Sequence, residues 1–425
     1  MFKYILCFVV LSPLLGVALV ENGLYAPSLG HPGYSNGASV AFFVHCLVLL
    51  LFAWLAIDKK LGASKEIKPH VVKVPCFVSL AYIVFTINLI FLFVMLFGAG
   101  GLEVIRGRVQ KGEFRTSLGA MGALAYWITL YFAPTLLAYL SVVSTKITKS
   151  PRKTRLLAAN FAICSLIGLN WGFKSTTLAL LLPSVLILYW KISFKRALAF
   201  GLIAAVVLTM TFMLFDRANE GPGEILTYLA VRATVMQGDV SWGVWDLYRD
   251  KQPLPPYLPV LSVAMGDRFF SLISGIERRN FGEWVKYHYD YLLTNLIGYP
   301  LDEIEAGQSV TGTIFSEAVI ALGSPGFLLF SIFGGLVAGV CYNIIKDAIG
   351  DGRFIRAAIS SNYFCLPVFS WLNGGGITIL FTATVFIGIG TSYWLLRRCE
   401  NLAGWSGRSV SVGFVARASQ PATKG

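Results

Sequence analysis

The stretch GLNWGFKSTTLALLLP, residues 168–183, places one lysine, Lys174, between two strongly apolar runs. FAICSLIGL precedes the lysine and LALLLPSVLILYW follows it. Apolar runs of this kind are typical of helices that cross a lipid bilayer, which need about 20 mostly apolar residues. A lysine at the bilayer centre costs about 2.5–3.5 kcal/mol on insertion scales. The pattern therefore predicts a helical hairpin with Lys174 near its tip, at the membrane surface.

The whole chain has the composition of a membrane protein. Of its 425 residues, 56% are hydrophobic and 13% are charged, and the mean hydropathy is +0.68. A soluble domain carries about 25% charged residues. Ten segments are predicted to span the membrane, of which the fifth, sixth and ninth are short: 4–20, 40–57, 75–99, 119–144, 157–171, 175–190, 197–215, 324–345, 357–372 and 377–396.

The predicted fold class follows from these segments. We expect an all-α polytopic membrane protein of about ten transmembrane helices with one long, partly helical periplasmic loop. Residues 1–215 form helices 1–7 in this prediction, 216–323 the periplasmic loop, 324–396 helices 8–10, and 397–425 a basic cytoplasmic tail.

The charged residues predict the orientation of the spans. With the N-terminus in the cytoplasm, the inside segments hold 22 of the 35 Lys and Arg residues and 5 of the 22 Asp and Glu residues, a net charge of +17. The outside segments then sum to −4. This asymmetry is what the positive-inside rule describes. We therefore expect both termini in the cytoplasm, and we interpret the net +13 as membrane orientation rather than as nucleic-acid binding.

The first segment and the metal-ligand residues are less distinctive. MFKYILCFVVLSPLLGVALV is either a cleaved signal peptide or the first span, and because Val20 is a poor cleavage residue we expect a helix. All seven cysteines lie in predicted spans or on the cytoplasmic side, so no structural disulfide is predicted. No two of the four histidines have metal-ligand spacing, and neither a Walker loop nor a dinucleotide fingerprint is present, so the sequence predicts no metal and no cofactor.

The insert at 216–323 carries most of the outside chemistry. Its 108 residues include 14 acidic, 8 basic and 14 aromatic side chains. Segment 225–250 is predicted to be helical, and 282–298 an amphipathic helix lying at the membrane surface. The aromatic rings form either an interfacial belt or a carbohydrate-binding surface, because flat apolar rings with a polar edge suit sugar rings. The candidate sugar-binding residues are Trp242, Trp245, Trp284 and His288.

Three motifs add to this plan of many spans with one long loop late in the chain. The first is the basic stretch RGRVQKGEFR at 106–115, and the second is GFKSTTLALLL at 172–182. The third is GTIFSEAVIALGSPGFLLF at 312–330, with Glu317, Gly323 and Gly326 at its motif positions. Together these features resemble the Wzy-type O-antigen and oligosaccharide repeat-unit polymerases. Two departures are that Lys174 replaces the arginine of the family's hairpin motif and that ten spans are few for the family.

The resemblance implies a metal-independent glycosyltransferase without a cofactor. In this family a growing glycan on undecaprenyl pyrophosphate is transferred to a new lipid-linked repeat unit at the periplasmic face of the bacterial inner membrane. The implied partners are the undecaprenyl-pyrophosphate-linked oligosaccharide, the lipid bilayer and a chain-length regulator protein.

That chemistry assigns roles to particular residues. Cations neutralise the pyrophosphate leaving group, and Arg115, Lys174 and Arg268 are candidates for binding it. The candidate catalytic residues are Arg232, which also faces the leaving group, and Asp239 or Glu317, one of which acts as base toward the acceptor hydroxyl. Each has a plainer interpretation: Lys174 as a snorkelling anchor, Arg232 as a solvated or ion-paired charge, and Glu317 as an acid that favours a helix dipole.

Three other functions remain open at this point. An O-antigen ligase would use a histidine of the periplasmic loop, for which His288 is available. A flippase or transporter of the lipid-linked unit would carry polar groups at the midplane of its spans, whereas the charges here gather at the outer edge. A membrane protein that binds or senses without catalysis would also fit the long loop.

Overall fold

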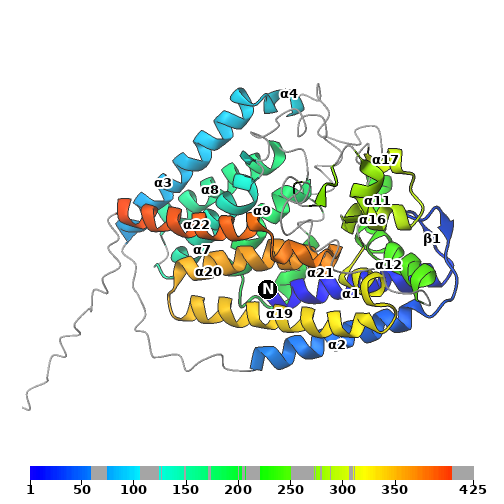
Figure 1. The fold of residues 1–425 in the computed structure, drawn as a ribbon. Coiled ribbons are helices and arrows are strands. Elements are labelled where there is room, and N and C mark those ends of the chain that lie inside the picture. Colours follow the sequence, from blue (N-terminus) through cyan, green and yellow to red (C-terminus); the bar gives the residue numbers. More distant parts are fainter. Residues whose placement is uncertain are drawn as a thin grey trace, which may run out of the picture.

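The computed structural model describes residues 1–58, 74–105, 124–125, 127–147, 150–170, 174–199, 201–202, 206, 221–249, 272, 274–277, 280–287, 289–305, 310 and 312–403. Within these ranges the chain is almost entirely helical (Figure 1), which confirms the all-α class. Among the described residues, strand structure is limited to one short antiparallel pair, β1 (Tyr25–Ala26) and β2 (His31–Pro32).

The helices follow one another with short connections. The first half of the chain contains α1 (Phe2–Glu21), α2 (Ala38–Asp58), α3 (Val74–Phe93), α4 (Gly101–Ile105), α7 (Ala133–Thr145), α8 (Pro151–Asn170) and α9 (Lys174–Leu188), with π-helical turns η1 (Val94–Gly98) and η2 (Ile128–Phe132). The second half contains α11 (Pro222–Ala233), α12 (Val235–Tyr248), α15 (Phe281–Trp284), α16 (Tyr289–Leu296), α17 (Leu301–Glu305), α18 (Ile314–Leu322), α19 (Gly326–Gly350), α20 (Phe354–Tyr363), α21 (Phe369–Gly374) and α22 (Ala383–Leu402). Short turns η3 (Val285–Tyr287), η4 (Phe364–Val368) and η5 (Ile377–Leu380) complete it, of which η4 is π-helical.

Six helical segments of the described chain are long and apolar enough to cross a membrane: Phe2–Glu21, Ala38–Ile57, Pro75–Gly98, Ile128–Thr145, Gly326–Gly350 and Ile377–Leu402. They coincide with six of the ten predicted spans. Predicted spans 157–171 and 175–190 fall within α8 and the 15-residue α9, and 357–372 falls within the continuous run of α20, η4 and α21. Span 197–215 lies mostly outside the described residues. The multi-span membrane class is thus confirmed, and six is the number of spans that length and composition support.

The contact between α2 and α19 shows how two of these spans pack. In Figure 1 the two helices run side by side. A Cβ on Gly335 would lie 2.3 Å from the Leu49 carbonyl oxygen, and one on Gly339 would lie 2.5 Å from Ala56 Cβ. Lipid provides no hydrophobic drive between helices, so small residues that let two backbones approach stabilise such pairs. The Asn343 amide adds a 2.7 Å hydrogen bond to the Ala56 carbonyl.

A second close crossing joins the insert to the first span. A Cβ on Gly16 of α1 would lie 2.3 Å from the Thr234 carbonyl oxygen, and one on Gly238 of α12 would lie 2.3 Å from the Val17 nitrogen. The segment predicted as one helix over 225–250 is two helices, because the chain breaks at Thr234 (φ −121°, ψ −77°). The break lets α12 lie along α1, so the described part of the insert packs into the helix bundle.

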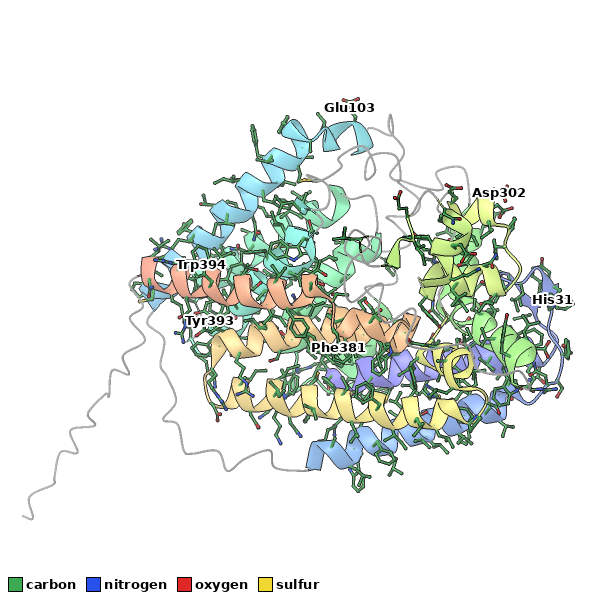
Figure 2. The ribbon with its side chains drawn as sticks, viewed as in Figure 1. His31, Glu103, Asp302, Phe381, Tyr393 and Trp394 are labelled. Carbon is green, nitrogen blue, oxygen red and sulfur yellow. The ribbon has the colours of Figure 1, made fainter. Side chains whose placement is uncertain are left out.

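The chain ends predicted to be cytoplasmic also come together. Ile147, Ala348, Phe354 and Cys399 belong to one buried cluster, and the Tyr139 hydroxyl donates to Glu400 Oε1 at 2.6 Å. Figure 2 places Tyr393 and Trp394 at this end of the molecule and His31 and Asp302 at the other. The bundle therefore has the two distinct ends that the predicted orientation requires.

Candidate functional site at the insert end of the bundle

Glu317 is the most tightly held acidic side chain at the insert end. It lies in the first turn of α18, and its side chain is buried. Its Oε2 accepts a 2.9 Å hydrogen bond from the indole Nε1 of Trp371, and its Oε1 accepts a 2.7 Å bond from the backbone N–H of Ile377. Glu317 therefore joins α18, which ends the insert, to α21 and η5, which enclose the predicted tip at 373–376.

Glycines shape that tip. Gly375 and Gly376 have φ of +79° and +77°, which other residues rarely adopt. A Cβ on Gly375 would lie 2.5 Å from a ring carbon of Tyr289, so the tyrosine ring of the insert rests against bare backbone. The Tyr289 hydroxyl also bonds the Thr313 carbonyl at 3.5 Å. The tip is thus fixed by the insert on two sides.

Hydroxyl groups connect α12 with α18. The Ser241 hydroxyl lies 2.9 Å from Thr313 Oγ1 and 2.8 Å from Ser316 Oγ, and all three side chains are buried. A fully bonded polar network of this kind fixes one arrangement of the helices around it. The network holds the two helices that carry Asp239 and Glu317 next to each other.

Asp239 itself lies in the protein interior. Its side chain is fully buried; Oδ2 accepts from the Ser28 N–H at 2.9 Å and Oδ1 from the Val240 N–H at 2.7 Å. Burial raises the pKa of Asp239 above its ordinary value, although these amide bonds oppose the shift. A raised pKa suits a general base. However, both oxygens are engaged by backbone amides in the core, so in this structure Asp239 anchors the 25–32 hairpin and does not face a substrate.

Arg232 remains available to an anion. It is exposed on α11, donates to the Tyr228 hydroxyl and lies 5.8 Å from the centre of that ring. Within the described part of the chain it has no acidic partner at ion-pair distance. The ion-paired interpretation is therefore not found there, and the guanidinium is free to pair with phosphate oxygens.

The three tryptophans predicted to bind sugar are not equivalent. Trp242 is 1% exposed and Trp284 is 2% exposed. Trp242 packs edge-on against Tyr34 and donates to the Tyr34 carbonyl, while Trp284 stacks on Phe281. These two rings form part of the core instead of an open surface, which corrects the prediction. Trp245 is half-buried and donates to the Asn36 carbonyl.

The remaining predicted residues are only partly described. Arg115, Arg268 and His288 lie outside the described residues. Lys174 begins α9, four residues after α8 ends at Asn170, so the predicted hairpin is present, while its side chain lies outside the description. The hairpin is tight: a Cβ on Gly168 would lie 2.5 Å from the Thr177 hydroxyl oxygen.

The predicted helix at 282–298 is also corrected. The chain forms three short pieces there, α15, η3 and α16. Tyr289 and Leu293 of α16 belong to the main buried cluster together with residues of α1, α2 and α19. Their burial explains why the segment does not lie as one helix on the membrane surface.

The sequence interpretation missed an exposed polar surface beside Trp242. We define the Tyr34–Asp246 surface as Tyr25, His31, Tyr34 and Asp246. The Tyr34 hydroxyl donates to Asp246 Oδ2 at 2.5 Å, which raises the pKa of Tyr34, and the Asn36 amide donates to Asp246 Oδ1 at 3.0 Å. Tyr25 and Tyr34 are 55% and 52% exposed. The available signal was the spacing of Asp239 and Asp246, which seven residues apart share one helix face.

Metal ligands do not gather in the described part of the chain, where no three His, Cys, Asp or Glu side chains lie close enough to hold an ion. Comparisons with protein-family models, curated proteins and solved structures find no match. The family resemblance therefore stays a prediction from the motifs.

Proposed function

We propose that this protein is a membrane-embedded glycosyltransferase that polymerises undecaprenyl-pyrophosphate-linked oligosaccharide repeat units into O-antigen or a related surface polysaccharide. One observation carries the proposal: the insert, the 25–32 hairpin and the 373–376 tip meet at one end of an apolar helix bundle. That end presents an exposed arginine, Arg232, and an exposed aromatic and carboxylate surface at Tyr34 and Asp246. A lipid-linked sugar diphosphate needs these groups next to lipid.

The proposed roles follow from exposure and charge. Arg232 and Lys174 pair with the diphosphate, since positive charge stabilises the leaving group as the sugar–oxygen bond breaks. The Tyr34–Asp246 surface holds sugar hydroxyls, with Tyr34 offering a ring face and Asp246 accepting hydrogen bonds. Glu317 keeps α18 and the 373–376 tip in place around the site. We propose that the enzyme acts at the periplasmic face of a bacterial inner membrane, in keeping with the predicted orientation.

A gel of surface polysaccharide from a deletion strain tests this proposal. We expect the long ladder of the parent strain to collapse to one repeat per lipid, and wild-type protein to restore it. Arg232→Ala should fail to restore long chains at equal protein abundance. Arg398→Ala is the matched control, because Arg398 is also exposed over an aromatic ring, that of Trp394, at the other end of the molecule. An unchanged ladder in the deletion strain would refute polymerisation, and unattached polymer would point to a ligase.

A transporter of the lipid-linked unit is the second candidate, and one observation favours it. His45 of α2 is 2% exposed inside a predicted span, and its Nδ1 lies 2.6 Å from the Ser331 hydroxyl of α19. Ionisable groups inside spans often belong to transport paths. If the deletion strain accumulates the lipid-linked unit on the cytoplasmic face, the protein is a flippase.

A further inference from the structure

A small polar cavity lies inside the helix bundle, among predicted spans rather than at the insert end. Its walls come from η2 and α7, from α20 and η4, and from α22; the polar side chains lining it are Tyr131, Thr135, Asn362, Tyr363 and Ser392. The cavity volume is about 10 Å³. This is close to the space that one water molecule needs.

The hydrogen bonds fix the orientation of the Asn362 amide. The Thr135 hydroxyl gives its only proton to the Tyr131 carbonyl at 2.5 Å, so its oxygen can only accept from Asn362, 3.0 Å away. The NH₂ group of Asn362 therefore faces Thr135, and it also donates to the Leu130 carbonyl at 3.4 Å. Oδ1 then faces the other way. Asn362 is 5% exposed, and its Oδ1 is buried without a hydrogen-bond partner.

Both π-helical turns beside the cavity leave backbone groups that need partners. The Tyr131 carbonyl of η2 accepts side-chain bonds from Thr135 and, at 3.4 Å, from Ser392. In η4, Pro367 has no N–H to give to a carbonyl one turn earlier. A buried acceptor left unsatisfied is costly, and ordered water is the usual way in which such groups are satisfied inside proteins.

We propose that this cavity holds one water molecule that donates to Asn362 Oδ1 and to the Ser392 hydroxyl oxygen. Ser392 gives its own proton to Tyr131 and keeps lone pairs for the water. The water ties α20 to α22 and supports the two π-helical turns. This site is independent of the proposed glycosyltransferase reaction, because it rests on the cavity and on the buried amide alone.

Hydroxyl-radical footprinting of the full-length protein in nanodiscs tests for the water, because radiolysis activates trapped water beside the residues it contacts. After rapid mixing into H₂¹⁸O, we expect modified Tyr363 to carry ¹⁶O, from water that exchanges slowly, while exposed residues such as Tyr34 carry ¹⁸O. Unmodified Tyr363, or Tyr363 carrying ¹⁸O as fast as Tyr34, would overturn the proposal.

Two variants and one matched control sharpen the test. Asn362→Leu and Ser392→Ala each remove one partner of the water and should lower Tyr363 modification severalfold relative to wild type. Asn343→Leu removes another buried amide, one that bonds the Ala56 carbonyl at the α2–α19 contact, and should leave it unchanged. Equal modification in all four proteins would contradict the assignment. A melting temperature raised by NaCl but not by choline chloride, and lost in Asn362→Leu, would assign the cavity to a cation instead.

Discussion

At the scale of single residues, the two buried carboxylates of the insert are held in different ways. Glu317 receives one indole donor and one backbone donor from a different part of the chain, whereas Asp239 receives two backbone amides. Both arrangements use charge to fix backbone, since hydrogen bonds to an ionised acceptor are stronger than neutral ones.

Glu317→Gln tests the first arrangement. A neutral amide can accept from either Trp371 or Ile377 while its NH₂ group faces the other donor, which leaves a buried N–H unsatisfied. We expect a loss of about 1–3 kcal/mol in the free energy of unfolding, measured by denaturant titration in detergent. Glu224→Gln on the exposed face of α11 is the control, expected to change stability by less than about 0.5 kcal/mol. Equal effects of the two variants would contradict the anchoring role.

Asp239→Asn tests the second through pH. Because burial raises the pKa of Asp239 in the native state, that state binds the proton more tightly than the unfolded chain. Stability from this group is therefore present below its ordinary pKa of 3.8 and is lost as pH rises toward the native pKa. We expect the melting temperature of wild type, relative to the variant, to fall between about pH 4 and pH 7. A difference that grows over this range would show that the native pKa is lowered.

At the scale of elements, close helix crossings at glycine organise the bundle. The crossing of α2 with α19 is between two predicted spans, and the crossing of α1 with α12 joins a span to the insert. Both depend on the absence of a side chain at one point.

Gly335→Ala should disrupt the first crossing. The added methyl group would meet the Leu49 carbonyl oxygen, so the helices must separate, at a cost of about 1–3 kcal/mol or more. Gly390→Ala in α22 is the matched control, because a Cβ there meets nothing within 4 Å, and alanine should be neutral or stabilising by up to about 1 kcal/mol. Unfolding in mixed micelles measures both. If Gly335→Ala is as stable as Gly390→Ala, the crossing is not close in solution.

Much of this element structure was predictable from hydropathy, and the exceptions have physical reasons. Six spans were found because a long apolar run has few alternatives to a buried helix. The kink at Thr234 and the division of 282–298 were not predicted, because both depend on contacts with α1 and with the last spans. For the same reason, burial of Trp242 and Trp284 was not visible in a composition that equally suits a sugar-binding surface.

At the scale of the whole molecule, the bundle has an insert end and a tail end. The predicted periplasmic segments meet at the first, and the predicted cytoplasmic segments 346–356 and 397–403 meet at the second. Charge asymmetry in the sequence predicts which end faces the cytoplasm.

Thiol labelling of the full-length protein tests that orientation. In a background without cysteine, Tyr34→Cys and Glu224→Cys should react with a membrane-impermeant maleimide in intact spheroplasts, because both side chains are exposed at the predicted outer end. Arg152→Cys and Arg353→Cys, exposed at the other end, should react after permeabilisation alone. Reaction of Glu224→Cys only after permeabilisation would place the insert inside the cell and remove the proposed reaction.

The crossing of Gly16 with Gly238 has a practical consequence for dissecting the protein. A fragment cut from 216–323 would leave the glycine face of α12 without its helical neighbour, and a chain truncated before residue 235 would leave α1 with the same gap. Reporter fusions to truncated chains would then describe a misassembled product. Domain swaps between related proteins would need to exchange α1 together with the insert, so the two are best treated as a single inheritable module.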